Sequence, residues 1–397
     1  MLKNIRFMLT PLVVALLMGN PVYASDVANV TPTQSININA KASLLMEADT
    51  GKILLEQNPH QKLAPASVTK VMTMLLIYEA IEEERIGWDQ IVTISDHAAS
   101  MGGSQIFLAP EEQQPVKDLV KSIVIASAND AAVAMAEFVA GNEETFVQMM
   151  NKKAQELGMT NTHFKNACGL DAEGHLTSAH DIALMSRELI TKYPEVFEYT
   201  KVRLDKIIHK TKKGEEEFGL TNTNRLIRSY TGATGLKTGS TSEALFCISA
   251  TAKKDDMSLI AVVLGAPDPS TRFDAAMKLF DYGYANYTIS AQEEEGTLIG
   301  EITVYKGKLE KSKVVLKAQQ RVLVPKGKNV NIESQIHLID SINAPVSEGA
   351  KAGEIIYTHE GNEVGRGDLI VPEEIEKAEV QDIMKRLFSR WLVSYSA

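Results

Sequence analysis

Three short polar motifs, far apart along a chain of 397 residues, constrain most strongly what this protein can fold into. They are Ser67-Val-Thr-Lys70, Ser127-Ala-Asn129 and Lys237-Thr-Gly239, in that order. On a helix, the spacing from Ser67 to Lys70 places a hydroxyl and an amine on one face. A serine hydroxyl is a poor nucleophile until a neighbouring base takes its proton, and Lys70 is the nearest candidate base. A fold that brings the three motifs together would be equipped for acyl transfer through a serine ester.

Each motif taken alone is weak evidence. Ser67 could be only a helix cap, Lys70 a surface lysine, Ser127 a turn residue, and Lys237 a charge at a strand edge. The ordered set is more informative, because Ser-x-x-Lys, Ser-Asp-Asn and Lys-Thr-Gly together mark class A β-lactamases and penicillin-binding proteins. The second motif is Ser-Ala-Asn in this chain, which departs from the β-lactamase form.

The composition is that of an ordinary globular protein, with 44% hydrophobic and 23% charged residues. The length predicts two domains. A net charge of −10 argues against a nucleic-acid binder, which would usually present a basic surface. We expect the two cysteines, Cys168 and Cys247, to be free and partly buried. Histidine and cysteine residues do not cluster at metal-ligand spacing, so we expect neither a metal nor another cofactor.

Residues 1–24 have the pattern of a secretory signal peptide. Lys3 and Arg6 form a basic region, and residues 7–18 are mostly apolar but too short to span a bilayer comfortably. Val22-Tyr23-Ala24 resembles a cleavage site, which predicts export and a mature start near Ser25. The alternative is an uncleaved anchor.

The pattern of residues 25–290 predicts an α+β domain, an antiparallel sheet flanked by helices. Apolar runs around the turn Asp49-Thr-Gly51 predict a hairpin over 41–57, and a second hairpin is expected from strands 244–252 and 258–264. Ser127 and Asn129 fall on a connector, where catalytic groups are commonly displayed. Pro65 places Ser67 in the first turn of a helix whose N–H groups point toward it. Helical periodicity predicts helices over 67–84, 116–125, 131–140, 143–157, 179–190 and 272–287.

From residue 291 the character of the sequence changes. Glu293-Glu-Glu-Gly296 reads as a linker, and short β-type segments follow at 299–304, 314–316, 322–324, 330–338 and 353–357. They predict a small all-β domain over 291–372 that carries no catalytic constellation, and a spacer or interaction role for it.

Residues 373–397 predict a terminal amphipathic helix. Lys385 and Arg386 lie opposite an apolar arc of about 140° on a helical projection. Such a helix is typical of an in-plane membrane anchor. The alternative is a helix docked on the protein's own β domain. The arc comprises Val380, Ile383, Met384, Leu387, Phe388, Trp391 and Tyr395.

Nearly the whole chain resembles the penicillin-binding D-alanyl-D-alanine carboxypeptidases of low molecular mass, most closely their Gram-positive members. Besides the three motifs, the resemblance rests on Gly103-Ser-Gln-Ile-Phe-Leu108, Ser127-Ala-Asn-Asp130, Gly169-Leu-Asp171 with Gly174-His175, and Gly235-Leu-Lys-Thr-Gly239. It implies a penicillin-recognising fold, a substrate ending in D-Ala-D-Ala from peptidoglycan, covalent binding of β-lactams, and a place at the outer face of the cytoplasmic membrane.

The resemblance also implies roles for individual residues. Ser67 would attack the carbonyl between the two D-alanines while Lys70 takes its proton, Ser127 would pass the proton to the leaving amine, and Asn129 would orient the substrate and Lys70. The terminal carboxylate would be bound by Lys237, Thr238, Thr241 and Arg272, beside Gly239. Backbone N–H groups of Ser67 and Ser240 would form the oxyanion hole.

Two stretches depart from the commonest family pattern, at Cys168 and at Ala233-Thr-Gly235, and they put substrate preference in doubt. The rival functions are a transpeptidase or endopeptidase, a β-lactamase-like enzyme, and a catalytically silent cell-wall scaffolding protein. For Arg272 the alternative is an ion pair with Asp268 or Asp274 at a helix start. We expect His175 to be structural.

Overall fold

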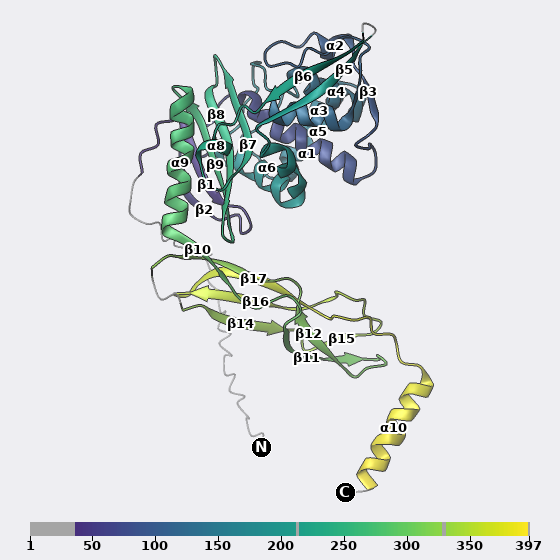
Figure 1. Ribbon diagram of the computed structural model, residues 1–397. Helices are drawn as coiled ribbons and strands as arrows, with labels where there is room; N and C mark the ends of the chain where they lie inside the picture. Colours follow the sequence, from purple (N-terminus) through teal and green to yellow (C-terminus); the bar gives the residue numbers. More distant parts are fainter. Residues whose placement is uncertain (1–35, 212–213, 328–330, 396–397) are drawn as a thin grey trace, which may run out of the picture. The chain divides into compact units, whose positions relative to one another are not determined.

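The computed structural model describes residues 36–211, 214–327 and 331–395 (Figure 1). The predicted signal peptide, residues 1–24, and the mature start at Ser25 lie outside this part of the chain.

A five-stranded sheet in the order β2-β1-β9-β8-β7 organises the larger domain (Figure 1). All of its neighbouring strands pair antiparallel. Both predicted hairpins are confirmed, and they pair with each other through β1 and β9. The strands are β1 (Ala42–Glu47), β2 (Ile53–Gln57), β7 (Ala233–Thr241), β8 (Leu245–Lys254) and β9 (Met257–Ala266).

Helices cover both faces of this sheet. On one face α9 (Pro269–Asn286) packs against β8 and β9, and on the other α6 (Ala179–Lys192) packs against β9 and β1 (Figure 1). Nine of the ten residues of β9 are buried, as expected for a strand covered on two sides. The predicted α+β architecture is thus what the described residues form.

The helical layer begins with a 3₁₀ turn, η1 (Ala66–Thr69), that runs into α1 (Lys70–Glu82). The sequence predicts an apolar stripe on α1, but ten of its thirteen residues are buried because sheet and helices surround it. The other predicted helices are confirmed within a few residues. They are α3 (Val116–Ile125), α4 (Asn129–Ala140) and α5 (Glu143–Glu156), besides α6 and α9. Four short helices were not predicted: α2 (Asp96–Ala99), η2 (Pro194–Val196), α7 (Phe197–Thr200) and α8 (Leu226–Ser229).

Two ribbons of this domain were also missed. β3 (Ile91–Thr93) pairs with β4 (Gln113–Pro115), and β5 (Leu204–Thr211) pairs with β6 (Gly214–Thr221) in register along eight residue pairs. β6 has three consecutive glutamates after its first residue and only two apolar side chains, so its sequence lacks the alternation of a half-buried strand. β6 is a strand because its backbone pairs with β5, and the hydrophobic pattern of its sequence does not indicate this.

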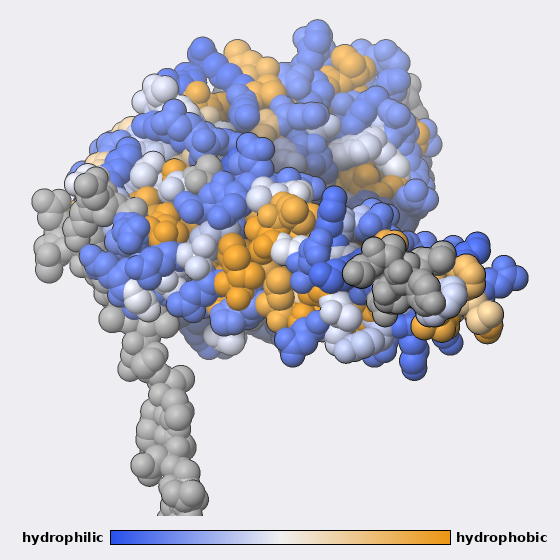
Figure 2. All heavy atoms as spheres, turned by 90° about the horizontal axis from the view of Figure 1, so that it is seen from below, coloured by the Kyte–Doolittle hydropathy of each residue, from blue (hydrophilic) through white to orange (hydrophobic). Residues whose placement is uncertain are grey.

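The remaining strands form an all-β region. β10 (Tyr287–Ala291) pairs with β13 (Arg321–Pro325), and six strands follow the order β14-β16-β17-β12-β11-β15. Three of these strands, β10, β15 and the glycine-containing β17, were not predicted. Hydrophobic side chains also gather on the surface of this region (Figure 2), where Leu298 and Ile336 are exposed. The six strands are β11 (Leu298–Tyr305), β12 (Lys311–Leu316), β14 (Glu333–Leu338), β15 (Ser341–Asn343), β16 (Lys351–His359) and β17 (Asn362–Ile370).

The terminal helix α10 covers Val380–Tyr395, so it begins seven residues later than predicted. The preceding segment is extended instead, and its Ile375 bridges Val346 and is buried. The apolar side chains from Val380 to Trp391 are between 48% and 76% exposed. The side chain of Tyr395 lies outside the described residues. Among the helices of the described residues, none is long and apolar enough to cross a membrane.

Candidate active site

Ser67 and Lys70 lie next to each other at the start of α1. Ser67 belongs to the 3₁₀ turn rather than to the α-helix, yet the three-residue spacing still brings its Oγ to 3.1 Å from Lys70 Nζ. The lysine side chain is fully buried. This desolvation lowers the pKa of Lys70 from the ordinary 10.5 to about 8, against the opposing charge of the nearby Asp130 carboxylate.

Two further acceptors surround the amine of Lys70. It donates to Asn129 Oδ1 at 2.6 Å and to the carbonyl oxygen of Cys168 at 2.7 Å. The amide of Asn129 has one possible orientation here, because its Nδ2 donates to the carbonyl of Gly102. Asn129 is the first residue of α4, whereas the sequence placed it on the preceding connector.

Ser127 and Lys237 meet although 110 residues separate them in the sequence. Lys237 Nζ donates to Ser127 Oγ at 2.7 Å and to the carbonyl of Thr238 at 3.0 Å. Ser127 lies on the connector before α4, as predicted, and its φ of 61° is unusual for a residue with a side chain. Burial and the neighbouring charges of Lys70 and Arg272 hold the pKa of Lys237 well below its usual value.

Strand β7 approaches the backbone of Ser67 closely at Gly239. A Cβ atom at Gly239 would lie 2.8 Å from the nitrogen of Ser67 and 2.9 Å from that of Val68. The third motif therefore requires glycine because the strand must reach the serine without a side chain between them. Further along β7, Ser240 is exposed, and the hydroxyl of Thr241 accepts from the N–H of Ala244 at 3.0 Å. The hydroxyls of Thr238 and Thr223 are 2.7 Å apart.

Arg272 lies behind β7 and is 7% exposed. Its guanidinium donates to the carbonyls of Gly239 and Cys247 at 3.1 and 3.2 Å, rather than to Asp268, which caps α9 through the N–H groups of Ser270 and Thr271. Burial lowers the pKa of Arg272 to about 10, and its Nε has no hydrogen-bond partner. The ion-pair alternative at the helix start is not what the contacts show.

Sequence reasoning quoted one carboxylate of the site, in Ser127-Ala-Asn-Asp130, but gave it no role. Asp130, adjacent to Asn129, is fully buried, and it accepts the N–H groups of Ile106 and Leu108 at 3.1 Å. It thereby fixes the loop whose Gly102 carbonyl holds Asn129. The signal in the sequence is a single charged residue within the apolar run 128–136.

The other residues singled out in the sequence have structural contacts. Cys168 and Cys247 are free, as predicted, and both are fully buried where partial burial was expected. His175 accepts the N–H of Lys165 on Nδ1, and its Nε2 lies 2.8 Å from the hydroxyl of Thr69. Burial lowers the pKa of His175 to about 4, so the ring is neutral near pH 7. No group of metal-ligating side chains occurs among the described residues.

A buried lysine beside a serine, with Ser-x-Asn and Lys-Thr-Gly at the same site, defines the class of serine enzymes to which penicillin-binding proteins and β-lactamases belong. Two family models match separate parts of the chain. Residues 28–268 match the model of D-alanyl-D-alanine carboxypeptidase, peptidase S11, and residues 292–377 match that of the C-terminal domain of penicillin-binding protein 5.

Individual relatives agree with these matches. D-alanyl-D-alanine carboxypeptidase DacF of Bacillus subtilis is 42% identical over 360 residues, which cover 90% of this chain and 92% of that protein. The structure of penicillin-binding protein 5 from Haemophilus influenzae superimposes with a TM-score of 0.74 at 31% identity, covering 87% of this chain and all of the other. Penicillin-binding protein D2 of Listeria monocytogenes in its ampicillin-bound form gives a TM-score of 0.56 at 32% identity, over 63% of this chain and all of the other.

The chain belongs to the D-alanyl-D-alanine carboxypeptidase family, peptidase S11, and is a serine-type D-alanyl-D-alanine carboxypeptidase with the C-terminal domain of penicillin-binding protein 5. The chain is therefore assigned neither as a β-lactamase nor as a catalytically silent scaffold.

Proposed function

We propose that this carboxypeptidase removes the terminal D-alanine from peptidoglycan stem peptides through an acyl-enzyme on Ser67, with Lys70 as the base. The contacts of Lys70 Nζ carry the proposal. A neutral amine has two N–H donors and a lone pair. Asn129 Oδ1 and the Cys168 carbonyl can only accept, so they take both N–H groups and leave the lone pair for the hydroxyl proton of Ser67.

In the first half-reaction, Ser67 Oγ bonds to the carbonyl carbon between the two D-alanines while its proton moves to Lys70. The C–N bond then breaks, and the departing amine receives a proton through Ser127, whose hydroxyl oxygen already accepts from Lys237. Water attacks the resulting ester, and the same groups return Ser67 to its starting state. Backbone N–H groups of Ser67 and Ser240 stabilise the oxyanion, each donor contributing roughly 3 kcal/mol.

Recognition of the substrate carboxylate falls to the end of β7. Lys237, Thr238 and Thr241 lie along this strand, with Arg272 against its back at Gly239. The buried positive charge of Arg272 raises the local potential where a carboxylate would bind. Because ampicillin is bound in the Listeria relative, we propose that β-lactams acylate Ser67 in the same way.

We also propose a division of labour along the chain. Residues 1–24 would direct export, 25–290 would carry catalysis, 291–372 would form a non-catalytic β domain, and 373–397 would anchor the enzyme at the outer face of the cytoplasmic membrane. The exposed apolar side chains of α10, Phe388 and Trp391 among them, support an in-plane anchor.

Replacement of the nucleophile tests the chemistry. Ser67→Ala should give a folded protein that neither forms a covalent adduct with labelled penicillin nor releases D-alanine from a pentapeptide. Mass spectrometry that finds the adduct on another serine would contradict the assignment. Adding an amine acceptor to the wild-type assay distinguishes a transpeptidase, because a cross-linked product would then form at the expense of free acid.

A second experiment tests the anchor. Deletion should start at Val380 rather than at 373, because Ile375 is buried in the β domain. The shortened mature protein should no longer sediment with anionic liposomes, while peptide hydrolysis in solution continues. The full-length double variant Phe388→Ser, Trp391→Ser is the matched control and should also lose binding. Equal liposome binding of all three proteins would show that α10 is not the membrane anchor.

A further inference from the structure

The segment 166–170 forms a turn that lies directly behind the proposed base. Its Cys168 carbonyl is the backbone acceptor of Lys70 Nζ, at 2.7 Å. The position of that carbonyl therefore helps to decide where the lone pair of Lys70 points. None of the three sequence motifs contains this turn, and the side chain of Cys168 makes no contribution to the contact.

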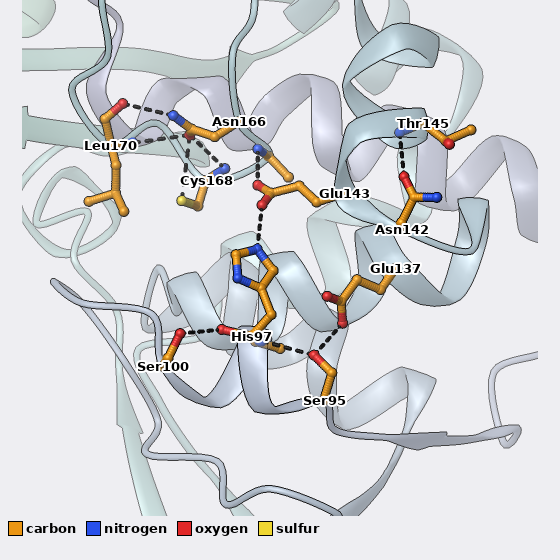
Figure 3. A network of polar contacts seen from close by, with 12 residues as sticks. Ser95, His97, Ser100, Glu137, Asn142, Glu143, Thr145, Asn166, Cys168 and Leu170 are labelled. Carbon is orange, nitrogen blue, oxygen red and sulfur yellow. Dashed lines mark hydrogen bonds and ion pairs between the residues drawn. The ribbon is translucent and has the colours of Figure 1, made fainter.

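The side chain of Asn166 builds the turn from inside (Figure 3). Its Oδ1 accepts the backbone N–H groups of Gly169 at 2.7 Å, Leu170 at 3.2 Å and Cys168 at 3.3 Å, and its Nδ2 donates to the carbonyl of Leu170 at 2.9 Å. One amide thus takes up the amide hydrogens of three consecutive residues. With these N–H groups turned inward to Asn166, the Cys168 carbonyl is left free to face the lysine.

The outer side of the turn is fixed on α1, the helix that follows the nucleophile, and on α5. Thr73 of α1 donates to the carbonyl of Ala167 at 2.6 Å. Glu143 of α5, labelled in Figure 3, accepts the N–H of Ala167 at 2.9 Å. Gly169 has a φ of 88°, and a Cβ atom there would lie 1.9 Å from the carbonyl oxygen of Ala66. The turn is therefore in contact with the residue that precedes Ser67.

We propose that Asn166 is a positioning residue for acylation. It holds the Cys168 carbonyl against Lys70, so that one N–H of the neutral amine stays bound there and the lone pair stays aimed at Ser67. This inference rests on the function proposed above for Lys70. Asn166 makes none of its hydrogen bonds with Ser67 or Lys70, so its effect is transmitted through the backbone of the turn.

The test compares two substitutions in the full-length mature enzyme, with a fluorescent penicillin as the acylating probe. Asn166→Ala removes every hydrogen bond from the centre of the turn. We expect its acylation rate constant to fall by roughly 100-fold, the usual penalty for a misplacement of about 1 Å, while the affinity of the initial non-covalent complex changes little.

Asn166→Asp keeps the acceptor oxygen but introduces a negative charge behind Lys70. Acylation at high pH should recover most of the wild-type rate, and the acid limb of the pH profile should move to higher pH, because a carboxylate favours the ammonium form. The added charge would shift this limb whatever the role of Asn166, so the discriminating result is the recovery of the rate at high pH by the variant that keeps the acceptor oxygen.

Asn151 offers a matched control. Its side chain also bridges backbone groups: it accepts from the N–H of Phe164 at 2.8 Å and donates to the carbonyls of Val147 and Phe164, both at 3.0 Å. None of these hydrogen bonds is with residues 166–170. Asn151→Ala should lower the melting temperature without reducing acylation of the folded protein. An equal loss of acylation in Asn151→Ala and Asn166→Ala would overturn the proposal.

The remaining outcomes are also decisive. Wild-type acylation by folded Asn166→Ala would overturn the positioning role. Should that variant fail to fold, a folded Asn166→Asp enzyme whose acylation stays slow at high pH would do the same. Lys70→Ala, measured in parallel, separates the role of Lys70 as base from the role of Asn166. If Lys70→Ala acylates normally, the proposed function itself is wrong. If Lys70→Ala does not acylate while Asn166→Ala acylates normally, only the positioning role of Asn166 is wrong.

Discussion

Substitution of Gly239 by alanine tests how closely β7 must approach the nucleophile. The new Cβ would lie 2.8 Å from the nitrogen of Ser67, 2.9 Å from that of Val68 and 3.0 Å from Ala66 Cβ. To regain ordinary van der Waals separation, the strand and the 3₁₀ turn must move apart by about 0.6 Å. That movement separates the two N–H groups proposed as the oxyanion hole, since Ser240 follows Gly239 directly.

The expected magnitude follows from the loss of one oxyanion donor, roughly 100-fold in the rate of acylation. Overpacking should also reduce the free energy of unfolding by about 1–3 kcal/mol. Acylation by fluorescent penicillin and thermal melting measure the two effects separately. Gly219→Ala is the matched control, because this strand glycine of β6 has no atom within 4 Å of the position a Cβ would take. A Gly239→Ala enzyme that acylates within about threefold of the wild type would refute the argument, because an intact oxyanion hole cannot tolerate such a movement.

Two further predictions concern the buried basic side chains of Lys70 and Arg272. Because the base acts as the neutral amine and its pKa is about 8, acylation by penicillin should rise with pH and level off above about pH 8; a rate constant that is flat between pH 6 and 9 would contradict Lys70 as the base. Arg272→Met should raise the KM for a D-Ala-D-Ala peptide by roughly tenfold, or about 1.4 kcal/mol, since it removes the buried positive charge that attracts the carboxylate; it should have little effect on a peptide with an amidated terminus. Equal losses for both peptides would indicate that the arginine supports β7 instead of the carboxylate pocket.

Much of the site was predictable from residue types alone. The hydroxyl and amine of Ser67 and Lys70 need only a helical spacing to meet, and both hairpins of the central sheet follow from local turn and strand signals. These features depend on interactions between near neighbours. The β5–β6 ribbon was missed because its order comes from pairing of the two strands rather than from an apolar face.

The sequence by itself determined which chemical groups the enzyme possesses and the order in which they occur. Only the tertiary structure decided what those groups can do. Lys70 has an amine pKa near 8 because α1 is surrounded by sheet and helices, and Lys237 reaches Ser127 because β7 runs beside the connector before α4. The Cys168 carbonyl is part of a backbone that every residue shares, so no side-chain pattern could reveal it as the acceptor that orients the base. Burial and backbone position are properties of distant segments packed together, and local sequence does not encode them.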